Sequence, residues 1–425
     1  MSRWAEAPQA SGQNELGKTP SRLGVLSILR YRNYRLYWLG QFPSVLGQNM
    51  QYVSMAWLVL QLTGSPLALG LVGLAQSAPN IALAFLGGAV ADRTDRRRLL
   101  IGTQALTALL FAVLGLLVIT EWVSIWHVVL VGVLLGVVRS FDQPSRQGLL
   151  PMLVPREEIP LAVPLGNLVW QLSRMLGPAL AGLLIAFVGI GETYFVAAAG
   201  FVIALTLFSL IHLGEPVARP ASRGLGHDIW EGIRYIRTDE VCAWLLGMTF
   251  FNSVFGLSYQ IIMPLIVQDV LHAGSDGFGF LQAASGVGSL AGSVVVAQLA
   301  SHASPVRQIF IGAGAFGLLL VAFALSPYFG LSLALLFFVG VANQVYMTTV
   351  NTTLQMHVPD EMRGRVMGVW GLTWSLMPLG GTISGAIAQV SGPQVALAIG
   401  GVLVFAMAVW MAARSRLQLA NGRLA

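Results

Sequence analysis

Charged side chains are rare in this chain, so those inside its apolar stretches are the first candidates for chemistry. In the stretch near residues 124–145, Arg139 and Asp142 lie three residues apart, and Arg146 follows at its end. These spacings place the three side chains on one face of a helix. Because neighbouring arginines favour the charged form of a carboxylate, we interpret Arg139 and Asp142 as an ion-pair network. A proton-carrying role for Asp142 is the alternative.

A second polar stripe lies in the stretch near residues 161–188. Asn167, Gln171 and Arg174 recur at i, i+4 and i+7 and therefore share one helical face. Arg174 has no acidic neighbour on that helix. A charge in such a place usually faces a cavity or a partner. Arg174 is therefore predicted either to bind substrate or to join helices through backbone carbonyls.

Polar side chains of the same kind recur in other apolar stretches. Their amide and hydroxyl groups either contact a polar substrate or bond helices to one another, at about 0.6 kcal/mol per bond in a membrane. Both readings stay open for each residue. The candidates for a substrate cavity are Gln41, Gln48, Tyr52, Asn167, Gln171, Arg174, Asn252, Tyr259, Gln344 and Asn351.

The composition indicates that these side chains lie on membrane-spanning helices. Charged residues make up only 10% of the 425 and hydrophobic ones 56%, whereas soluble domains are about 25% charged. A spanning helix needs about 20 mostly apolar residues. The fold class is therefore an all-α membrane protein with twelve transmembrane helices. The predicted spans are 34–61, 66–91, 99–119, 124–145, 161–188, 192–213, 241–269, 275–300, 308–326, 329–352, 366–389 and 393–413.

The basic residues predict the orientation of these spans. The loops near 62–65, 120–123, 189–191, 270–274, 327–328 and 390–392 contain no Lys or Arg, and the opposite loops carry many. Cytoplasmic loops hold the excess of Lys and Arg in membrane proteins. Both termini are therefore expected in the cytoplasm.

The longest loop divides the chain into two halves. Its Ile229, Ile233 and Ile236 fall on one face and predict an amphipathic helix on the membrane surface, with a plain solvated linker as the alternative. The predicted domains are a cytoplasmic tail (1–33), a six-helix bundle (34–213), a cytoplasmic linker (214–240), a second six-helix bundle (241–413) and a cytoplasmic tail (414–425).

The two halves carry a repeated sequence. GVVRSFDQPSRQGLLPMLVPREE begins at Gly136, and GVANQVYMTTVNTTLQMHVPDEM begins at Gly340, 204 residues later. At the same shift Gly177 matches Gly381. A parallel repeat of six spans is typical of transporters that hold substrate near the midplane, between the repeats.

The most specific run is GGAVADRTDRRR, residues 87–98. Its residues follow the spacing G-x-x-x-D-R-x-x-R-[KR], which closely resembles motif A of the major facilitator superfamily. The matching residues are Gly88, Asp92, Arg93, Arg96 and Arg97. Asp95 stands where that motif usually has Gly. The segments NYRLYWLGQFPSVLGQNMQ and FDQP…LVP are similar to bacterial drug and siderophore exporters of the enterobactin and macrolide efflux type.

The resemblance implies the major facilitator fold, with two pseudo-symmetric bundles in a bacterial inner membrane and a cavity lined by spans one, four, seven and ten. It also implies that the motif A residues form a clasp that holds the outward-open state; enforcing topology is their alternative role. Gly177, Pro178 and Gly182 resemble motif C of antiporters, in which the proline kinks span five. Arg139 resembles the motif B arginine.

These features predict a secondary active transporter and not an enzyme. We expect a proton-coupled exporter of a small amphipathic compound, such as a drug or a siderophore-like metabolite, working by alternating access as a monomer. An uptake symporter or uniporter of a small metabolite has the same architecture and remains the alternative.

Other classes fit the sequence poorly. The segment GQNELGKT, residues 12–19, has P-loop spacing, but Pro20 follows at once and no apolar strand precedes it, so no nucleotide site is expected. A pump driven by ATP would need a separate ATPase. The single Cys242 excludes a cysteine-based metal cluster. No cofactor, metal or nucleic acid is expected.

Overall fold

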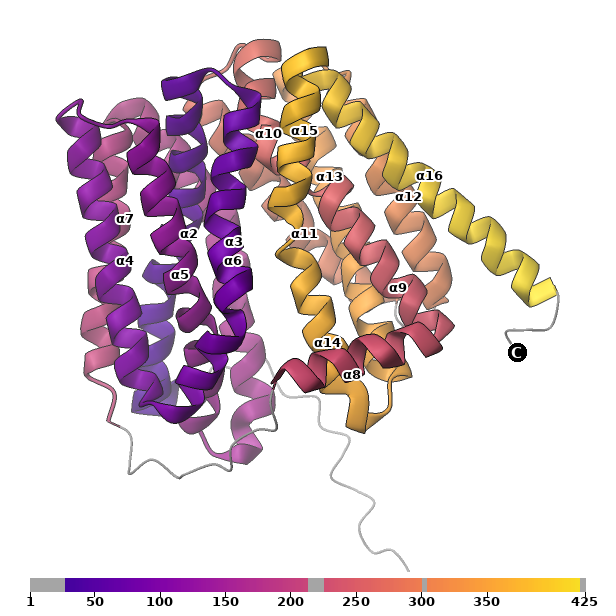
Figure 1. The fold of residues 1–425 in the computed structure, drawn as a ribbon, viewed down its shortest axis with the longest axis horizontal. Helices are drawn as coiled ribbons and strands as arrows, with labels where there is room; N and C mark the ends of the chain where they lie inside the picture. Colours follow the sequence, from indigo (N-terminus) through magenta and orange to yellow (C-terminus); the bar gives the residue numbers. More distant parts are fainter. Residues whose placement is uncertain (1–26, 213–224, 300–303, 421–425) are drawn as a thin grey trace, which may run out of the picture.

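The computed structural model describes residues 27–212, 225–299 and 304–420. Within these residues every regular element is a helix, and the long helices run side by side (Figure 1). The predicted all-α fold with twelve spans is confirmed. The P-loop-like segment, parts of both tails and the start of the linker lie outside the described residues.

The first six spans form one group of helices. A short helix, η1 (Ser27–Arg30), precedes them. At the turn between the first two, the Ser65 hydroxyl accepts a hydrogen bond from the N–H of Ala68, and Pro66 follows where no N–H donor is needed. The six helices are α2 (Arg32–Thr63), α3 (Pro66–Arg93), α4 (Arg96–Ile119), α5 (Ile125–Leu149), α6 (Ile159–Phe187) and α7 (Ile190–Ser209). Two short helices, η2 (Leu150–Met152) and η3 (Arg156–Glu158), join α5 to α6.

The other six spans form a second group, in which two spans are interrupted. The seventh span consists of α9 (Glu240–Phe251), η4 (Asn252–Gly256), α10 (Tyr259–Leu265) and η5 (Ile266–Val270), where η4 and η5 are π-helical. The eleventh consists of α14 (Asp360–Trp374) and α15 (Met377–Ser391). The remaining helices are α11 (Ser275–Leu299), α12 (Pro305–Ala324), α13 (Phe329–His357) and α16 (Pro393–Ala420).

Ten helical stretches among the described residues are long and apolar enough to cross a membrane. The two remaining spans fall short for different reasons. α2 carries many amide side chains, and α14 and α15 are separated by a break, after which Pro378 lacks an N–H to donate. Large apolar side chains such as Leu109, Phe187 and Val390 are exposed on the outside, as expected for residues that contact lipid.

The predicted linker helix is present as α8 (Leu225–Thr238), which lies crosswise to the spans in Figure 1. Tyr235 and Ile236 pack against buried residues of the second group, and Ile233 is half-buried. Arg365 of α14 pairs with Glu231 at 3.2 Å. Part of the apolar side of α8 therefore packs against the second group of helices. The side chain of Ile229 lies outside the described residues.

The sequence repeat corresponds to a repeat in packing. A Cβ atom on Gly136 of α5 would overlap the backbone oxygen of Gln76 on α3. A Cβ atom on Gly340 of α13 would likewise overlap the backbone oxygen of Ser285 on α11. In each group the fourth span thus contacts the second through a glycine at the matching position.

The two groups stand side by side in Figure 1, with α2–α7 on the left and α9–α16 on the right. The helix pairs that pack extensively between them are α3 with α15 and α6 with α11. We call the end whose loops lack Lys and Arg the arginine-free end, and the opposite end the basic end. The closest contacts between the groups lie toward the arginine-free end, where Ser65 Oγ donates to Gln389 Oε1 at 3.1 Å and Ser275 Oγ to the oxygen of Gly182 at 3.2 Å.

Candidate functional site

A cavity of about 670 Å³ lies between the two groups of helices. Its walls come from α2, α3, α5 and α6 on one side, and from the seventh span, α11 and the junction of α14 with α15 on the other. Trp170 and Trp374 add aromatic surface. The polar or charged side chains that line it are Gln48, Asn49, Gln51, Tyr52, Gln76, Ser77, Asn80, Arg139, Gln143, Gln171, Arg174, Gln260, Gln282, Ser285 and Ser375.

A second cavity of about 420 Å³ adjoins the first. The two share wall residues on α2, α3, α5 and α6, among them Gln48 and Arg139. The second cavity continues along α5 past Asp142 as far as Gln147, near the basic end of that helix. The hollow interior therefore extends toward the basic end.

Four of the ten predicted cavity residues line the larger cavity. They are Gln48, Tyr52, Gln171 and Arg174. Of the polar stripe on the fifth span, Gln171 and Arg174 line the cavity and Asn167 does not.

The other six do not line it, and several bond helices instead. Asn252 donates to Asn343 at 3.4 Å, the Tyr259 hydroxyl contacts the Ser285 hydroxyl at 3.1 Å, and Gln344 donates to Thr348 of its own helix. Gln41 is buried, Asn167 is exposed, and Asn351 accepts a bond from Gln355. The tenth span, α13, also contributes no residue to this lining, contrary to the expectation from the family.

Sequence reasoning missed much of the polar lining. Gln76 and Asn80 share one face of α3, and Gln143 lies one turn after Arg139 on α5. The signal was present, because each of these amides has a polar neighbour at i±4.

Arg139 and Arg174 differ from Arg146 in that no hydrogen bond or ion pair to a described residue fixes their guanidinium groups. Neither makes a hydrogen bond or an ion pair with any described residue, and both line the larger cavity. Arg139 is exposed to the cavity and Arg174 is partly exposed. The charge of Asp142, three residues further along α5, attracts Arg139, but the two side chains make no direct ion pair.

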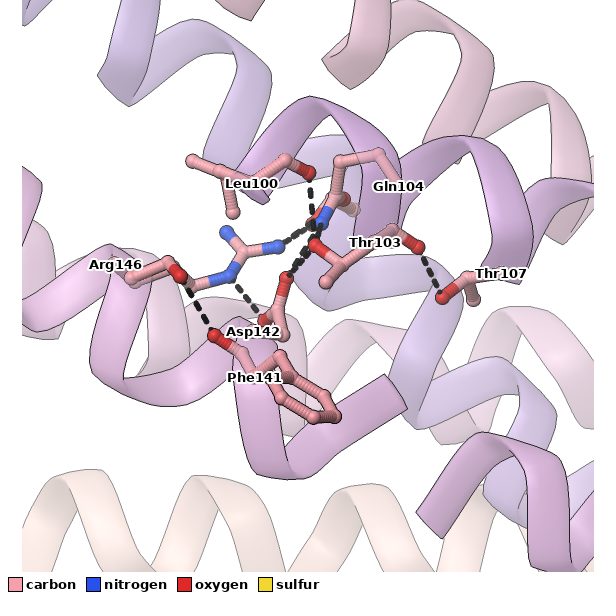
Figure 2. A network of polar contacts seen from close by, with 9 residues as sticks. Leu100, Thr103, Gln104, Thr107, Phe141, Asp142 and Arg146 are labelled. Atoms are coloured by element: carbon pink, nitrogen blue, oxygen red, sulfur yellow. Dashed lines mark hydrogen bonds and ion pairs between the residues drawn. The ribbon is translucent and has the colours of Figure 1, made fainter. Parts of the chain in front are cut away.

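Asp142 is held by Arg146, in a network with Thr103 and Gln104 of α4 (Figure 2). Arg146 Nε donates to Asp142 Oδ2 at 2.6 Å. Gln104 Nε2 and Thr103 Oγ1 of α4 donate to Asp142 Oδ1 at 2.6 and 2.9 Å. Arg146 Nη2 donates to Ser44 Oγ of α2 at 2.6 Å. An ion-pair network at Asp142 is therefore present, with Arg146 as its cation.

The motif A residues lie between α3 and α4 at the basic end. Arg96 Nη2 bonds Asp92 Oδ1 at 2.7 Å, and Arg96 Nη1 donates to the oxygen of Gly148 on α5 at 2.8 Å. Arg97 donates to the carbonyls of Phe208 and Ser209 on α7. Arg96 thus reaches the fourth span, α5, through a backbone oxygen.

Two further details of this run follow from packing and capping. Asp95, the departure from the usual motif, accepts the N–H groups of Arg97 and Arg98 and so caps the start of α4. Gly88 is partly buried, but the close helix contact is made by Gly87, where a Cβ atom would overlap the oxygen of Ser140. Arg93 is exposed.

The motif C-like residues lie where the two groups meet. Gly177 packs against Asn49 of α2, whereas Gly182 meets α11 of the second group. A Cβ atom on Gly279 of α11 would lie 2.5 Å from the oxygen of Pro178. Trp57 and Phe278 stack nearby, with ring centroids 6.2 Å apart. These contacts close the space between the groups toward the arginine-free end.

One group of donor atoms could hold a metal ion. Asp239, Cys242 and His357 place one such atom each within 4.8 Å of one another. Asp239 Oδ1 caps α9 by accepting the N–H of Cys242 at 2.8 Å, and Oδ2 pairs with His357 Nε2 at 3.0 Å. Burial acts to raise the pKa of Asp239, but these bonds outweigh it and the pKa is lowered. The three side chains already join the start of α9 to the end of α13.

A polar cavity enclosed between two repeated six-helix groups, in a chain with apolar spanning helices, defines an integral membrane transporter of the two-bundle type. The profile of the transmembrane secretion effector family, within the major facilitator superfamily, matches residues 23–422, and the chain belongs to this family. It is a transporter and not an enzyme.

Proteins similar to this chain include a siderophore transporter and a drug efflux pump, which are types that the sequence resemblance led us to expect. The staphyloferrin A transporter of Staphylococcus aureus is 23% identical over 360 residues, covering 84% of this chain and 90% of the relative. The multidrug efflux pump Tap of Mycolicibacterium fortuitum is 26% identical over 388 residues, covering 88% and 94%. Macrolide efflux proteins and enterobactin exporters are also similar, as expected.

A solved structure supports the fold. The bacterial homologue of the human lysosomal transporter Spinster superposes with a TM-score of 0.69 at 15% identity, covering 93% of this chain and 96% of that one. The predicted major facilitator fold is therefore confirmed.

Proposed function

We propose that this protein is a secondary exporter of small amphipathic compounds, driven by the proton gradient across a bacterial inner membrane. The observation that carries the proposal is the cavity between the two groups of helices, which has polar walls from both groups and is closed by direct contacts toward one end. The relatives whose names include efflux or export favour the outward direction.

The orientation is part of the proposal. The basic end faces the cytoplasm, because positive residues gather on that side of membrane proteins. Both termini are then cytoplasmic, and the two helix groups with their linker act as the predicted domains in a monomer. In this orientation the cavities extend toward the cytoplasm, which supports a state that can receive a compound from inside.

The motif A residues would act in the other state. Here Arg96 bonds within the first group, to Asp92 and to the backbone oxygens of Ala91 and Gly148. We propose that Asp92 and Arg96 contact the second group when the basic ends approach one another, and so stabilise the outward-open state.

Proton coupling would act through Asp142. Among the described residues, it is the only acidic side chain that lines either cavity. Protonation would remove the carboxylate charge that Arg146 neutralises and would loosen the contact between α5, α4 and α2. A proton taken up there can therefore change how these helices pack.

Everted membrane vesicles test the proposed direction and energy source. Vesicles that contain the protein are energised and offered a panel of drugs and siderophores, with vesicles lacking the protein as the control. We expect accumulation of at least one compound, and its loss when an uncoupler is added. Accumulation only in right-side-out vesicles, or accumulation that an uncoupler leaves unchanged, would refute the proposal.

A further inference from the structure

The larger cavity carries positive charge that the protein itself does not neutralise. Arg139 on α5 and Arg174 on α6 both line it, and neither bonds any other described residue. The arginine side chain keeps its proton under all ordinary conditions. Charges inside a membrane protein are normally paired because an unpaired charge is costly there. Two such cations in one cavity therefore require an explanation.

No carboxylate of the cavity can supply the missing partner. None of its described lining residues is acidic. Asp142, in the adjoining cavity, already accepts bonds from Arg146, Gln104 and Thr103. Arg146 is likewise engaged, since it bonds Asp142 and Ser44. Among the described residues of the two cavities and of the Asp142 network, three arginines stand against one carboxylate, which leaves two positive charges.

The rest of the lining suits the remainder of an amphipathic molecule. The second group contributes only neutral side chains, such as Gln260, Gln282 and Ser285, which can bond hydroxyl or carbonyl groups. Trp374 and Met377 offer apolar surface, and aromatic faces favour flat rings. Cations thus stand on one wall of the cavity, and amide and aromatic groups on the other.

We infer that the transported compound is an amphipathic organic anion, whose carboxylate or comparable anionic group pairs with Arg139 and Arg174. This inference rests on the proposed function and adds the charge of the substrate. The planar guanidinium binds a carboxylate through two parallel hydrogen bonds. An anion in this position contacts the first group through charge and the second through stacking and amides, and so bridges the two moving halves.

The charge of the substrate also affects the direction of transport. An anion that leaves the cell moves negative charge outward, and a membrane potential that is negative inside favours this movement. Inward movement of a proton transfers charge in the same electrical sense. Export of an anion and proton uptake therefore add to one another.

Three probes of equal shape and different charge test the inference. They are 2-naphthoate, 2-naphthamide and 2-naphthylmethylammonium, and calorimetry measures their binding to the purified full-length protein. We expect 2-naphthoate to bind at least about tenfold more tightly than the amide, as a charge-assisted pair does, and the ammonium to bind most weakly. The Arg139→Gln/Arg174→Gln protein should lose this preference and still bind the amide.

Control variants separate charge from folding. Arg98→Gln removes an exposed arginine outside the cavity and should leave all three affinities unchanged. Arg174→Lys keeps the charge but not the two-pronged geometry, and should retain part of the preference. Retained amide binding shows that a variant is folded.

The inference is wrong if the amide or the ammonium binds as tightly as 2-naphthoate, if 2-naphthoate does not bind at millimolar concentration, or if the double variant keeps the preference. Vesicle transport distinguishes this failure from failure of the proposed function. If energised vesicles accumulate only the neutral or the cationic probe, the proposed exporter function stands and the proposed anionic substrate is wrong. Tight anion binding without energised accumulation of any compound would reject the exporter.

Discussion

The carboxylate of Asp142 is buried and accepts hydrogen bonds from three side chains, those of Arg146, Gln104 and Thr103. The side chains of Asp142 and Arg146 are 8% and 4% exposed, and their closest atoms are 2.6 Å apart. Neither charge is easily hydrated there, so each depends on the other. Removing one partner of a buried pair typically costs about 3–5 kcal/mol, because the remaining charge is left without compensation.

A double-mutant cycle tests this dependence. We expect Asp142→Asn and Arg146→Gln each to lower the thermal unfolding temperature of the detergent-purified protein strongly. The double variant should be more stable than the sum of the single effects implies, because it leaves no unpaired charge. Strictly additive effects would show that the pair contributes nothing as a pair.

Asp92 and Arg96 form an ion pair of a different kind. The Asp92 side chain is 49% exposed, and exposed pairs at i, i+4 are worth only about 0.3–0.5 kcal/mol. Asp92→Asn should therefore leave stability and membrane insertion nearly unchanged while slowing transport at least about tenfold, if the pair stabilises a transient state. If the Asp92→Asn protein transports the compound that accumulates in everted vesicles at the normal rate, these charges serve only to fix the membrane topology.

Sequence reasoning found the interior charges but not all of their partners. Arg174 and Asp142 stood out because charge is rare in apolar helices. The pairing of Asp142 with Arg146 and not with Arg139 depends on Gln104 and Ser44, which come from other helices. Helical periodicity places residues on a face of their own helix, and it does not say which neighbour that face meets.

At the scale of helices, the apolar pattern located the spans well and their interruptions poorly. The predicted span 66–91 compares with Pro66–Arg93, and 275–300 with Ser275–Leu299. Spans ten to twelve continue beyond the apolar residues, as in α13, which ends at His357 rather than 352. The π-helical turns at Asn252–Gly256 and Ile266–Val270 arise from packing between helices, which a single-helix pattern does not contain.

The start of α9 gives a prediction of pH dependence. The pKa of Asp239 is lowered in the folded protein, so its contribution to stability is present above the unfolded value near 3.8 and is lost as the pH falls through the folded value. Asp239→Ala should cost about 1 kcal/mol at neutral pH, as the loss of a helix cap does. It should also flatten the fall in unfolding temperature below about pH 4.

Thr238→Ala provides the matched control for Asp239. Thr238 is exposed and bonds only the backbone of its own helix, so its loss should change stability by less than about 0.5 kcal/mol. An Asp239→Ala protein with the same acid profile as the wild type would show that the cap and the His357 contact do not stabilise α9.

The contact between α6 and α11 gives a prediction about closure. Gly182→Leu would place a side chain into the backbone of Ser275, so the groups could no longer approach at the arginine-free end. We expect transport to fall at least about tenfold, since overpacking of this size costs about 1–3 kcal/mol. A Cβ atom on Gly102 of α4 would have no neighbouring atom within 4 Å, so the Gly102→Leu protein should transport normally. Equal transport by both variants would contradict a closed contact at Gly182.

At the scale of the whole molecule, two repeated groups of helices have the larger cavity between them and touch at one end. Contacts of α3 with α15 and of α6 with α11 close the arginine-free end, and the cavities extend toward the basic end. Transport requires that this closed end open while the basic end closes. Alternating access therefore requires that the contacts at the arginine-free end be temporary.

A reversible cross-link across the closed end tests this requirement most directly. The Ser65 hydroxyl donates to Gln389 Oε1 across the two groups at 3.1 Å. For the test, both residues are replaced by cysteine in a protein whose own Cys242 is replaced by serine. The transport assay uses a compound that accumulates in the everted vesicles. We predict that oxidation of the Ser65→Cys/Gln389→Cys protein stops its transport and that a reductant restores it. Oxidation should leave transport by each single-cysteine protein unchanged. Transport at the full rate after complete cross-linking would contradict alternating access through this end.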